Sequence, residues 1–150
     1  LCRRQRQMCI RDSGLTYSGH PASCAAGLAT MDVLQNTSIL ESSANELAPY
    51  FAKALESLAD HPVVGQVRAK GLVAAVELVK DKGSRERLAP ESGGAVYTRD
   101  RAIENGLMLR QTGDAMIMSP PFVTSTEEVN ALVSKLTSAL DKTAAFYNVK

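Results

Sequence analysis

Three hydroxyl side chains stand in a row near the start of the chain, directly before a segment that is expected to be helical. They are Thr16, Tyr17 and Ser18, and the turn that follows ends in Pro21, which suits the first position of a helix. The unpaired N–H groups at a helix start favour anions, so this segment could bind a phosphate or a carboxylate. Local chemistry alone favours an ordinary capping turn.

A second candidate is Arg110, near the end of a short apolar segment. It precedes the turn sequence Thr112-Gly113-Asp114, and Met108 lies on the same face of the expected strand. A guanidinium at this place could bind a carboxylate through two parallel hydrogen bonds. The alternative is a surface ion pair with Asp114, which would contribute about 0–1 kcal/mol.

The sequence lacks the other common active-site signatures. His20 and His61 are its two histidines, each directly before a proline, and neither has a cysteine or carboxylate at metal-ligand spacing. We therefore predict no metal site. P-loop, dinucleotide-binding and nucleophile-elbow motifs are also missing. If this chain serves an enzyme, it supplies only part of a site.

Length and composition indicate a globular protein of about one domain. The chain has 150 residues, of which 45% are hydrophobic and 22% charged. No apolar run approaches the roughly 18 residues of a membrane span. The net charge of +1 argues against nucleic acid or an anionic membrane surface as a partner.

Residues 1–13 differ from the rest. They contain four arginines against one aspartate, and two of the three cysteines, Cys2 and Cys9. They could form a basic nucleic-acid arm, but they are more similar to translated adapter or linker sequence, and we interpret them as a non-native leader. Cys24 then remains as the single cysteine, which predicts no disulfide framework and a cytoplasmic location.

Periodicity predicts the elements in the order helix, helix, strand, helix, hairpin, helix. A helix that begins at Pro21 carries many small residues, which predicts burial on several sides, and a second helix over 40–58 is expected to kink or restart at Pro49. A strand over 72–79 is followed by a loop over 80–94 and a helix over 95–105, whose apolar contributors would be Val96, Ala102 and Ile103. Strands over 107–111 and 115–119 form the hairpin.

The last helix has the clearest start signal. Ser125 and Glu128 match a capping box, and Thr124 with Glu127 is an equally good pair. Together these elements predict an α/β protein of the α+β kind, in which a small, mostly antiparallel sheet is covered on one face by helices.

Three segments resemble, in order, blocks of the class III aminotransferases, which are fold-type I enzymes dependent on pyridoxal phosphate. They are GLTYSGHPASCAAGLATMDVL (14–34), VVGQVRAKGLVAAVELVKDK (63–82) and NGLMLRQTGDAMIMSPPFVTSTEEVNAL (105–132). The last two are most similar to the omega-amino-acid:pyruvate transaminase branch. The resemblance implies an enzyme that moves an amino group from an amine or omega-amino acid to pyruvate or a similar keto acid.

The resemblance also implies roles for both candidate residues. Thr16 matches a threonine that contacts the cofactor phosphate of the other subunit in a homodimer, and Arg110 matches an arginine that binds the substrate carboxylate and swings in or out. Residues 14–38 would be an interface segment and connecting helix, and 39–150 a C-terminal small domain. The Schiff-base lysine would lie upstream, so the chain alone is expected to be inactive.

Two other interpretations stay open at this point. The chain could belong to another class III enzyme, such as a glutamate-semialdehyde aminomutase or a diaminopelargonate-type enzyme. It could also be a non-catalytic small α/β module that binds a ligand.

Overall fold

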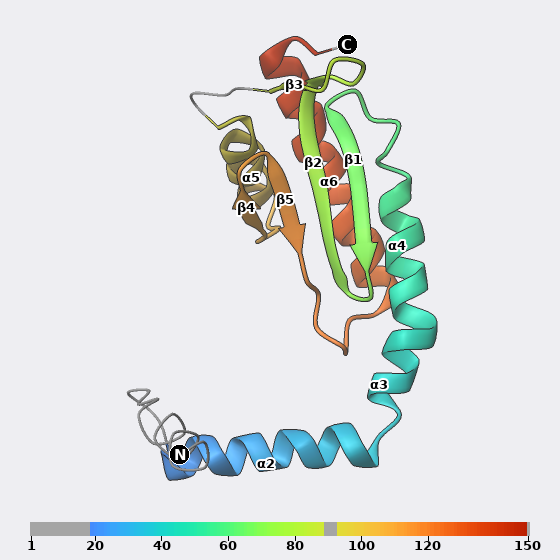
Figure 1. Cartoon of the computed structure of the whole chain (residues 1–150), viewed down its shortest axis with the longest axis vertical. Helices are drawn as coiled ribbons and strands as arrows, with labels where there is room; N and C mark the ends of the chain where they lie inside the picture. Colours follow the sequence, from blue (N-terminus) through green and yellow to red (C-terminus); the bar gives the residue numbers. More distant parts are fainter. Residues whose placement is uncertain (1–18, 89–92, 150) are drawn as a thin grey trace, which may run out of the picture. The chain divides into compact units, whose positions relative to one another are not determined.

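The structure is a computed structural model that describes residues 19–88 and 93–149. The chain divides into two compact units between Ser38 and Ile39. The described part of the first unit consists mainly of one helix, α2 (Pro21–Asn36), and the second unit holds all of the strands (Figure 1).

Helix α2 begins as predicted. Its N-cap is His20, whose Nδ1 accepts a hydrogen bond from the Ser23 N–H at 3.4 Å, and Pro21 follows in the first turn. The expectation that this helix is buried on several sides is not met, because none of its residues is buried and Leu28 is 69% exposed.

The second unit contains the predicted sheet, and it is entirely antiparallel. Its four main strands lie in the order β1-β2-β5-β4, and a short β3 pairs with β2. The strands are β1 (Val64–Lys70), β2 (Val73–Asp81), β3 (Glu86–Arg87), β4 (Arg110–Thr112) and β5 (Ala115–Met118). The predicted hairpin over β4 and β5 is confirmed, with Gly113 at the positive φ of 57° that its turn requires.

Two strands, β1 and β3, were not predicted from the sequence. β3 lies inside the segment expected to be a loop. β1 is irregular because a bulge at Gly65 shifts its pairing with β2, so its apolar residues do not alternate strictly with polar ones. The close approach at this bulge also explains the glycine, since a Cβ there would lie 2.5 Å from Val79 Cγ1.

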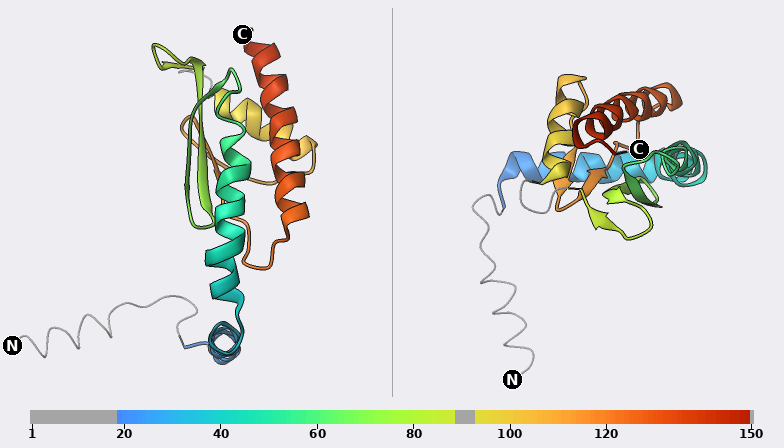
Figure 2. Two further views of the ribbon diagram at one scale, coloured as in Figure 1. Left: turned by 90° about the vertical axis from the view of Figure 1, so that its right-hand side faces the viewer. Right: turned by 90° about the horizontal axis from the view of Figure 1, so that it is seen from above.

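Helices cover one face of this sheet and leave the other face open (Figure 2). The covering helices are α4 (Ala48–Glu56), α5 (Gly94–Glu104) and α6 (Thr126–Tyr147). The core between the two layers comprises, among others, Phe51, Leu55, Val76, Leu78, Met116, Leu136 and Leu140. The fold class predicted from the sequence is thus confirmed.

The predicted helix over 40–58 is interrupted as expected near Pro49. A short helix α3 (Ile39–Ser42) runs into a π-helical segment, η1 (Ser43–Leu47), and α4 begins at Ala48 with Pro49 in its first turn. Proline has no N–H to donate, so the regular hydrogen-bond ladder changes register just before it.

Helix α5 faces the core differently from the prediction. Its buried residues are Gly94, Ala95, Thr98 and Ala102. Ala102 was expected among them, whereas Val96 is only half-buried and Ile103 is exposed. Small residues at these positions let the helix lie close to the sheet and to α6, which the larger Ile103 would prevent.

Helix α6 starts with the predicted capping box of Ser125 and Glu128. The Ser125 hydroxyl accepts from the Glu128 N–H at 3.2 Å, and the Glu128 carboxylate accepts from the Ser125 N–H at 2.8 Å. Hydrogen bonds from its own backbone N–H and then from the Ser125 and Thr126 side chains lower the pKa of Glu127. The structure therefore selects Ser125 over Thr124 as the cap.

Replacing Ser125 by alanine is expected to lower the free energy of unfolding by about 1 kcal/mol, since an N-cap acceptor is lost. Urea unfolding of the 150-residue chain measures this change. The matched control is Ser134→Ala, the same substitution at an exposed position inside α6. A loss at Ser134 as large as that at Ser125 would contradict the assignment of the cap.

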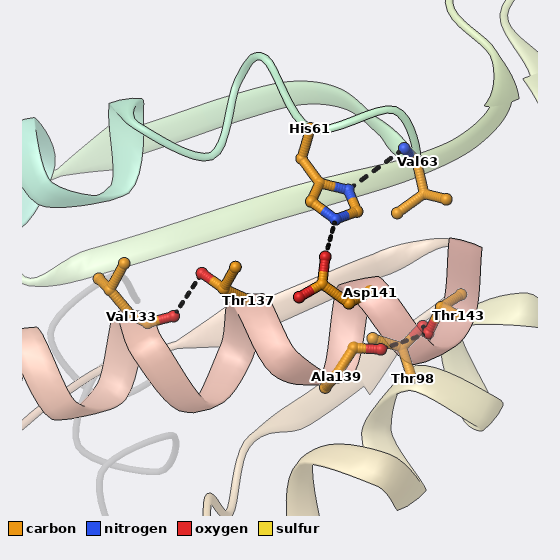
Figure 3. Close-up of polar contacts among 8 residues, drawn as sticks. All are labelled: His61, Val63, Thr98, Val133, Thr137, Ala139, Asp141 and Thr143. Atoms are coloured by element: carbon orange, nitrogen blue, oxygen red, sulfur yellow. Dashed lines mark hydrogen bonds and ion pairs between the residues drawn. The ribbon is translucent and has the colours of Figure 1, made fainter. Parts of the chain in front are cut away.

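Figure 3 shows two of the polar contacts that tie α6 to the rest of the unit. His61 Nε2 lies 3.2 Å from Asp141 Oδ1, and His61 Nδ1 accepts from the Val63 N–H at 3.4 Å. Deeper inside, the buried hydroxyls of Thr98 and Thr143 are 2.9 Å apart. The two contacts join α6 to the loop after α4 and to α5.

None of the helices in the described ranges is long and apolar enough to cross a membrane.

Candidate carboxylate-binding site

Arg110 is the first residue of β4, the edge strand of the sheet. It pairs with Ile117, whose neighbours Met116 and Met118 point into the core and are buried. Since side chains alternate between the faces of a strand, Ile117 and Arg110 lie on the face that the helices leave open. The exposed guanidinium is therefore available to a molecule that contacts this face.

The register places Arg110 in a row that crosses the whole sheet. Ile117 is paired with Ala75, and Ala75 with Arg68, so two small or apolar side chains lie between two arginines. A hollow of about 280 Å³ lies beside this row and is lined by Arg68, Ala69, Lys70, Val73, Ala74, Ala75 and Ile117. The open face of the sheet thus has small or apolar side chains at its centre and an arginine at each edge.

The ion pair between Arg110 and Asp114, which was the alternative role for this arginine, does not form. Asp114 Oδ2 instead accepts from Arg87 Nε at 2.5 Å, and this hydrogen bond and the charge of Asp114 raise the pKa of Arg87. Among the described residues, no hydrogen bond or ion pair involves the Arg110 side chain. The five N–H donors of Arg110 therefore contact no other described residue.

Arg87 is the residue that sequence reasoning missed. It lies 27 positions before Asp114, in a segment expected to be a loop. No local spacing could have revealed the pair, because β3 and the turn between β4 and β5 meet only when both pack beside β2.

A larger hollow of about 490 Å³ lies elsewhere and does not include Arg110. It is lined by residues 107–108, 118–121, 123–124 and several residues of the first turns of α6. Met108, which the sequence placed on the same strand face as Arg110, belongs to this hollow, is 89% exposed and precedes the strand. The structure therefore separates Met108 from the row that contains Arg110.

Thr16, Tyr17 and Ser18 lie outside the described residues. His20 caps α2, and His61 contacts Asp141. Within the described ranges no group of histidine, cysteine, aspartate and glutamate side chains could hold a metal ion.

The described residues do not by themselves form a pyridoxal phosphate pocket. An amine that forms a Schiff base needs an environment that lowers its pKa, such as burial. All described lysines are exposed, and the hydrogen bond with Glu86, together with its charge, raises the pKa of Lys80 instead. Lys82, Lys135 and Lys142 donate to carbonyl oxygens. No described lysine fits the cofactor-binding role.

Comparison with known proteins identifies the family. The family model for class-III aminotransferases matches residues 3–140. The chain is 43% identical over 132 residues to putrescine–pyruvate aminotransferase of Pseudomonas aeruginosa, a match that covers 88% of this chain and 29% of that protein. It is 36% identical to gamma aminobutyrate transaminase 3 of Solanum lycopersicum, covering 87% and 25% of the two chains. The chain thus spans less than a third of these relatives.

Solved structures agree with the sequence matches. An omega transaminase from Pseudomonas jessenii in complex with PMP superposes with a TM-score of 0.82 at 35% identity, over 91% of this chain and 30% of that one. An aminotransferase from Vibrio fluvialis in its PMP-bound form gives a TM-score of 0.80 at 33% identity, over 89% and 29%. The small antiparallel sheet with helices on one face is therefore part of a fold-type I transaminase architecture, and this chain belongs to the class-III aminotransferase family.

Proposed function

We propose that this chain is the C-terminal part of a pyridoxal-phosphate-dependent aminotransferase subunit. The intact subunit would move an amino group from an amine or omega-amino acid to pyruvate or a similar keto acid. The observation that carries the proposal is the family match over residues 3–140. The relatives include a putrescine–pyruvate aminotransferase, which supports an amine donor and pyruvate as acceptor.

Arg110 is proposed to bind the carboxylate of the substrate. It is exposed at the edge of the open sheet face and has no partner among the described side chains. A planar guanidinium can hold a carboxylate through two parallel hydrogen bonds. Its long side chain can also turn away when the substrate carries no carboxylate.

Thr16 is proposed to donate a hydrogen bond to the cofactor phosphate of a second subunit. This role makes the enzyme a homodimer, because each site would then need a residue from the neighbouring chain. Such a bond to a charged group contributes about 1.5–3 kcal/mol. When bound, the cofactor supplies the electron sink for the chemistry, and the protein orients it.

Three further features belong to the proposal. Residues 14–38 form the interface segment with its helix, and 39–150 form the small domain. The Schiff-base lysine lies in the part of the subunit that precedes this chain. The enzyme is cytoplasmic, because residues 14–150 contain a single cysteine, Cys24, and so predict no disulfide framework.

The proposal is tested by transamination assays on the intact subunit. With pyridoxal phosphate added, we expect pyruvate to be converted to alanine at the expense of an amine donor, and we expect no conversion by the 150-residue chain alone. Analytical ultracentrifugation of the intact protein would report the dimer. Absence of alanine formation across a panel of amines and omega-amino acids would refute the proposal that pyruvate is the acceptor. Activity of the 150-residue chain alone would refute the proposal that the Schiff-base lysine lies upstream of it.

A further inference from the structure

The carboxylate of Asp114 lies on the same hairpin as Arg110, at the end of the turn that joins β4 to β5. It is the only acidic side chain over residues 107–118. Its side chain is 16% exposed, so its charge is largely removed from water and needs a cationic partner nearby.

Arg87 supplies the partner from a different hairpin. Its Nε donates to Asp114 Oδ2 at 2.5 Å, whereas Asp114 Oδ1 is buried and accepts no hydrogen bond from the described residues. One carboxylate oxygen of Asp114 thus has no hydrogen-bond donor among the described residues. The positive charge of Arg87 weakens the attraction of Asp114 for a second cation.

Both ends of this contact are held in place by neighbouring bonds. The β2–β3 turn is closed by Asp81, which accepts from the Ser84 N–H and hydroxyl at 2.7 Å, and the Lys80–Glu86 pair at 2.8 Å spans the same hairpin. The Asp114 carbonyl accepts from the Leu78 N–H at 2.8 Å. These bonds hold Arg87 and Asp114 together without involving the Arg110 side chain.

The β4–β5 turn is fixed in the same way. Gln111 Nε2 donates to the Gly113 carbonyl at 2.7 Å. Since the turn is held by its own side chain and by β2, loss of Arg87 would leave the backbone in place and expose only the charge of Asp114. The cation nearest in sequence to Asp114 is Arg110, four residues before it.

We propose that Arg87 is a positioning residue for recognition of the substrate carboxylate, because it occupies Asp114 and so leaves Arg110 free. The inference rests on the proposed role of Arg110. Without Arg87, Asp114 binds Arg110, and a substrate carboxylate must compete with an acid on the same hairpin.

The first test measures KM in the intact subunit for pyruvate and for an aromatic aldehyde, which is an acceptor without a carboxylate. Arg87→Gln is expected to raise the KM for pyruvate about tenfold, equivalent to about 1.4 kcal/mol. The KM for the aldehyde and the kcat with either acceptor should stay close to those of the wild type. The control Lys80→Gln removes the adjacent ion pair of the same hairpin and should change neither constant.

The double variant Arg87→Gln/Asp114→Asn separates this role from a structural one. Removing the competing acid should return the KM for pyruvate to near its wild-type value, although the Arg87 bond is still missing. If Arg87→Gln leaves this KM unchanged, or if the double variant is as impaired as the single one, the proposal is overturned.

A second readout needs no activity and uses the 150-residue chain. The rate at which phenylglyoxal modifies Arg110, followed by peptide mass spectrometry, should fall severalfold in Arg87→Gln, because an ion-paired guanidinium reacts more slowly. It should recover in the double variant. If this pattern appears while Arg110→Ala leaves pyruvate turnover intact, the pairing stands and the proposed function of Arg110 fails. Unchanged modification rates in all variants would overturn the pairing itself.

Discussion

Replacing Arg110 by alanine in the intact subunit is expected to lower the rate of the amino-donor half-reaction about 10- to 100-fold for carboxylated donors. Arylalkylamines, which have no carboxylate to bind, should lose little. The reason is that a charge-assisted hydrogen bond to an ionised group contributes more than a neutral one, and Arg110 has no other described partner to satisfy. Single-turnover kinetics with each donor alone, without keto acid, isolates this step.

The matched control for this prediction is Arg68→Ala. Arg68 lies in the same row on the same face of the sheet, at its opposite edge, and is exposed like Arg110. Among the described residues its side chain forms one long ion pair, with Glu77 at 3.4 Å, which contributes little on an exposed surface. Equal losses for both classes of donor in Arg110→Ala, or an equal effect of Arg68→Ala, would rule out a specific carboxylate role.

The largest effect on stability is expected from Phe51→Ala. The side chain is fully buried between α4 and the sheet, where truncation removes apolar contacts and leaves a cavity. Such a change costs about 3–5 kcal/mol, which is a large share of the stability of a domain of this size. Urea unfolding of the 150-residue chain, followed by circular dichroism, measures the shift of the midpoint.

Phe122→Ala provides the comparison, since it makes the same chemical change at a side chain that is 48% exposed. Its cost should be well below that of Phe51→Ala. Similar losses at the two positions would show that Phe51 does not lie in the core as described. A chain that stays fully folded after Phe51→Ala, with an unchanged midpoint, would contradict the packing of α4 on the sheet.

Local signals in the sequence were reliable where a few neighbouring residues decide the structure. The capping box at Ser125, the interruption near Pro49 and the turn at Gly113 were each predicted and each appear. In all three cases the cause acts within about four residues: a side chain reaches a free N–H, a ring removes a donor, or a positive φ favours glycine.

Predictions that depended on long-range packing were less reliable. β1 was not predicted because its bulge disturbs the alternation, Ile103 was expected to face the core but is exposed, and α2 was expected to be buried but is not. Each of these outcomes is decided by which other element lies against the segment. Residue types along the chain carry little information on that choice.

At the candidate site, too, some features follow from the local sequence and others from long-range packing. The amino-acid sequence alone was enough for the fold class and for the family resemblance, since its motifs occur in order along the chain. It also suggested Arg110, whose role stays a prediction. Only the three-dimensional arrangement assigned Asp114 to Arg87 and placed Arg110 on the open face of the sheet. The ion pair joins residues 27 positions apart, and it exists only once β5 and β3 both pair with β2. No local sequence pattern predicts that pairing.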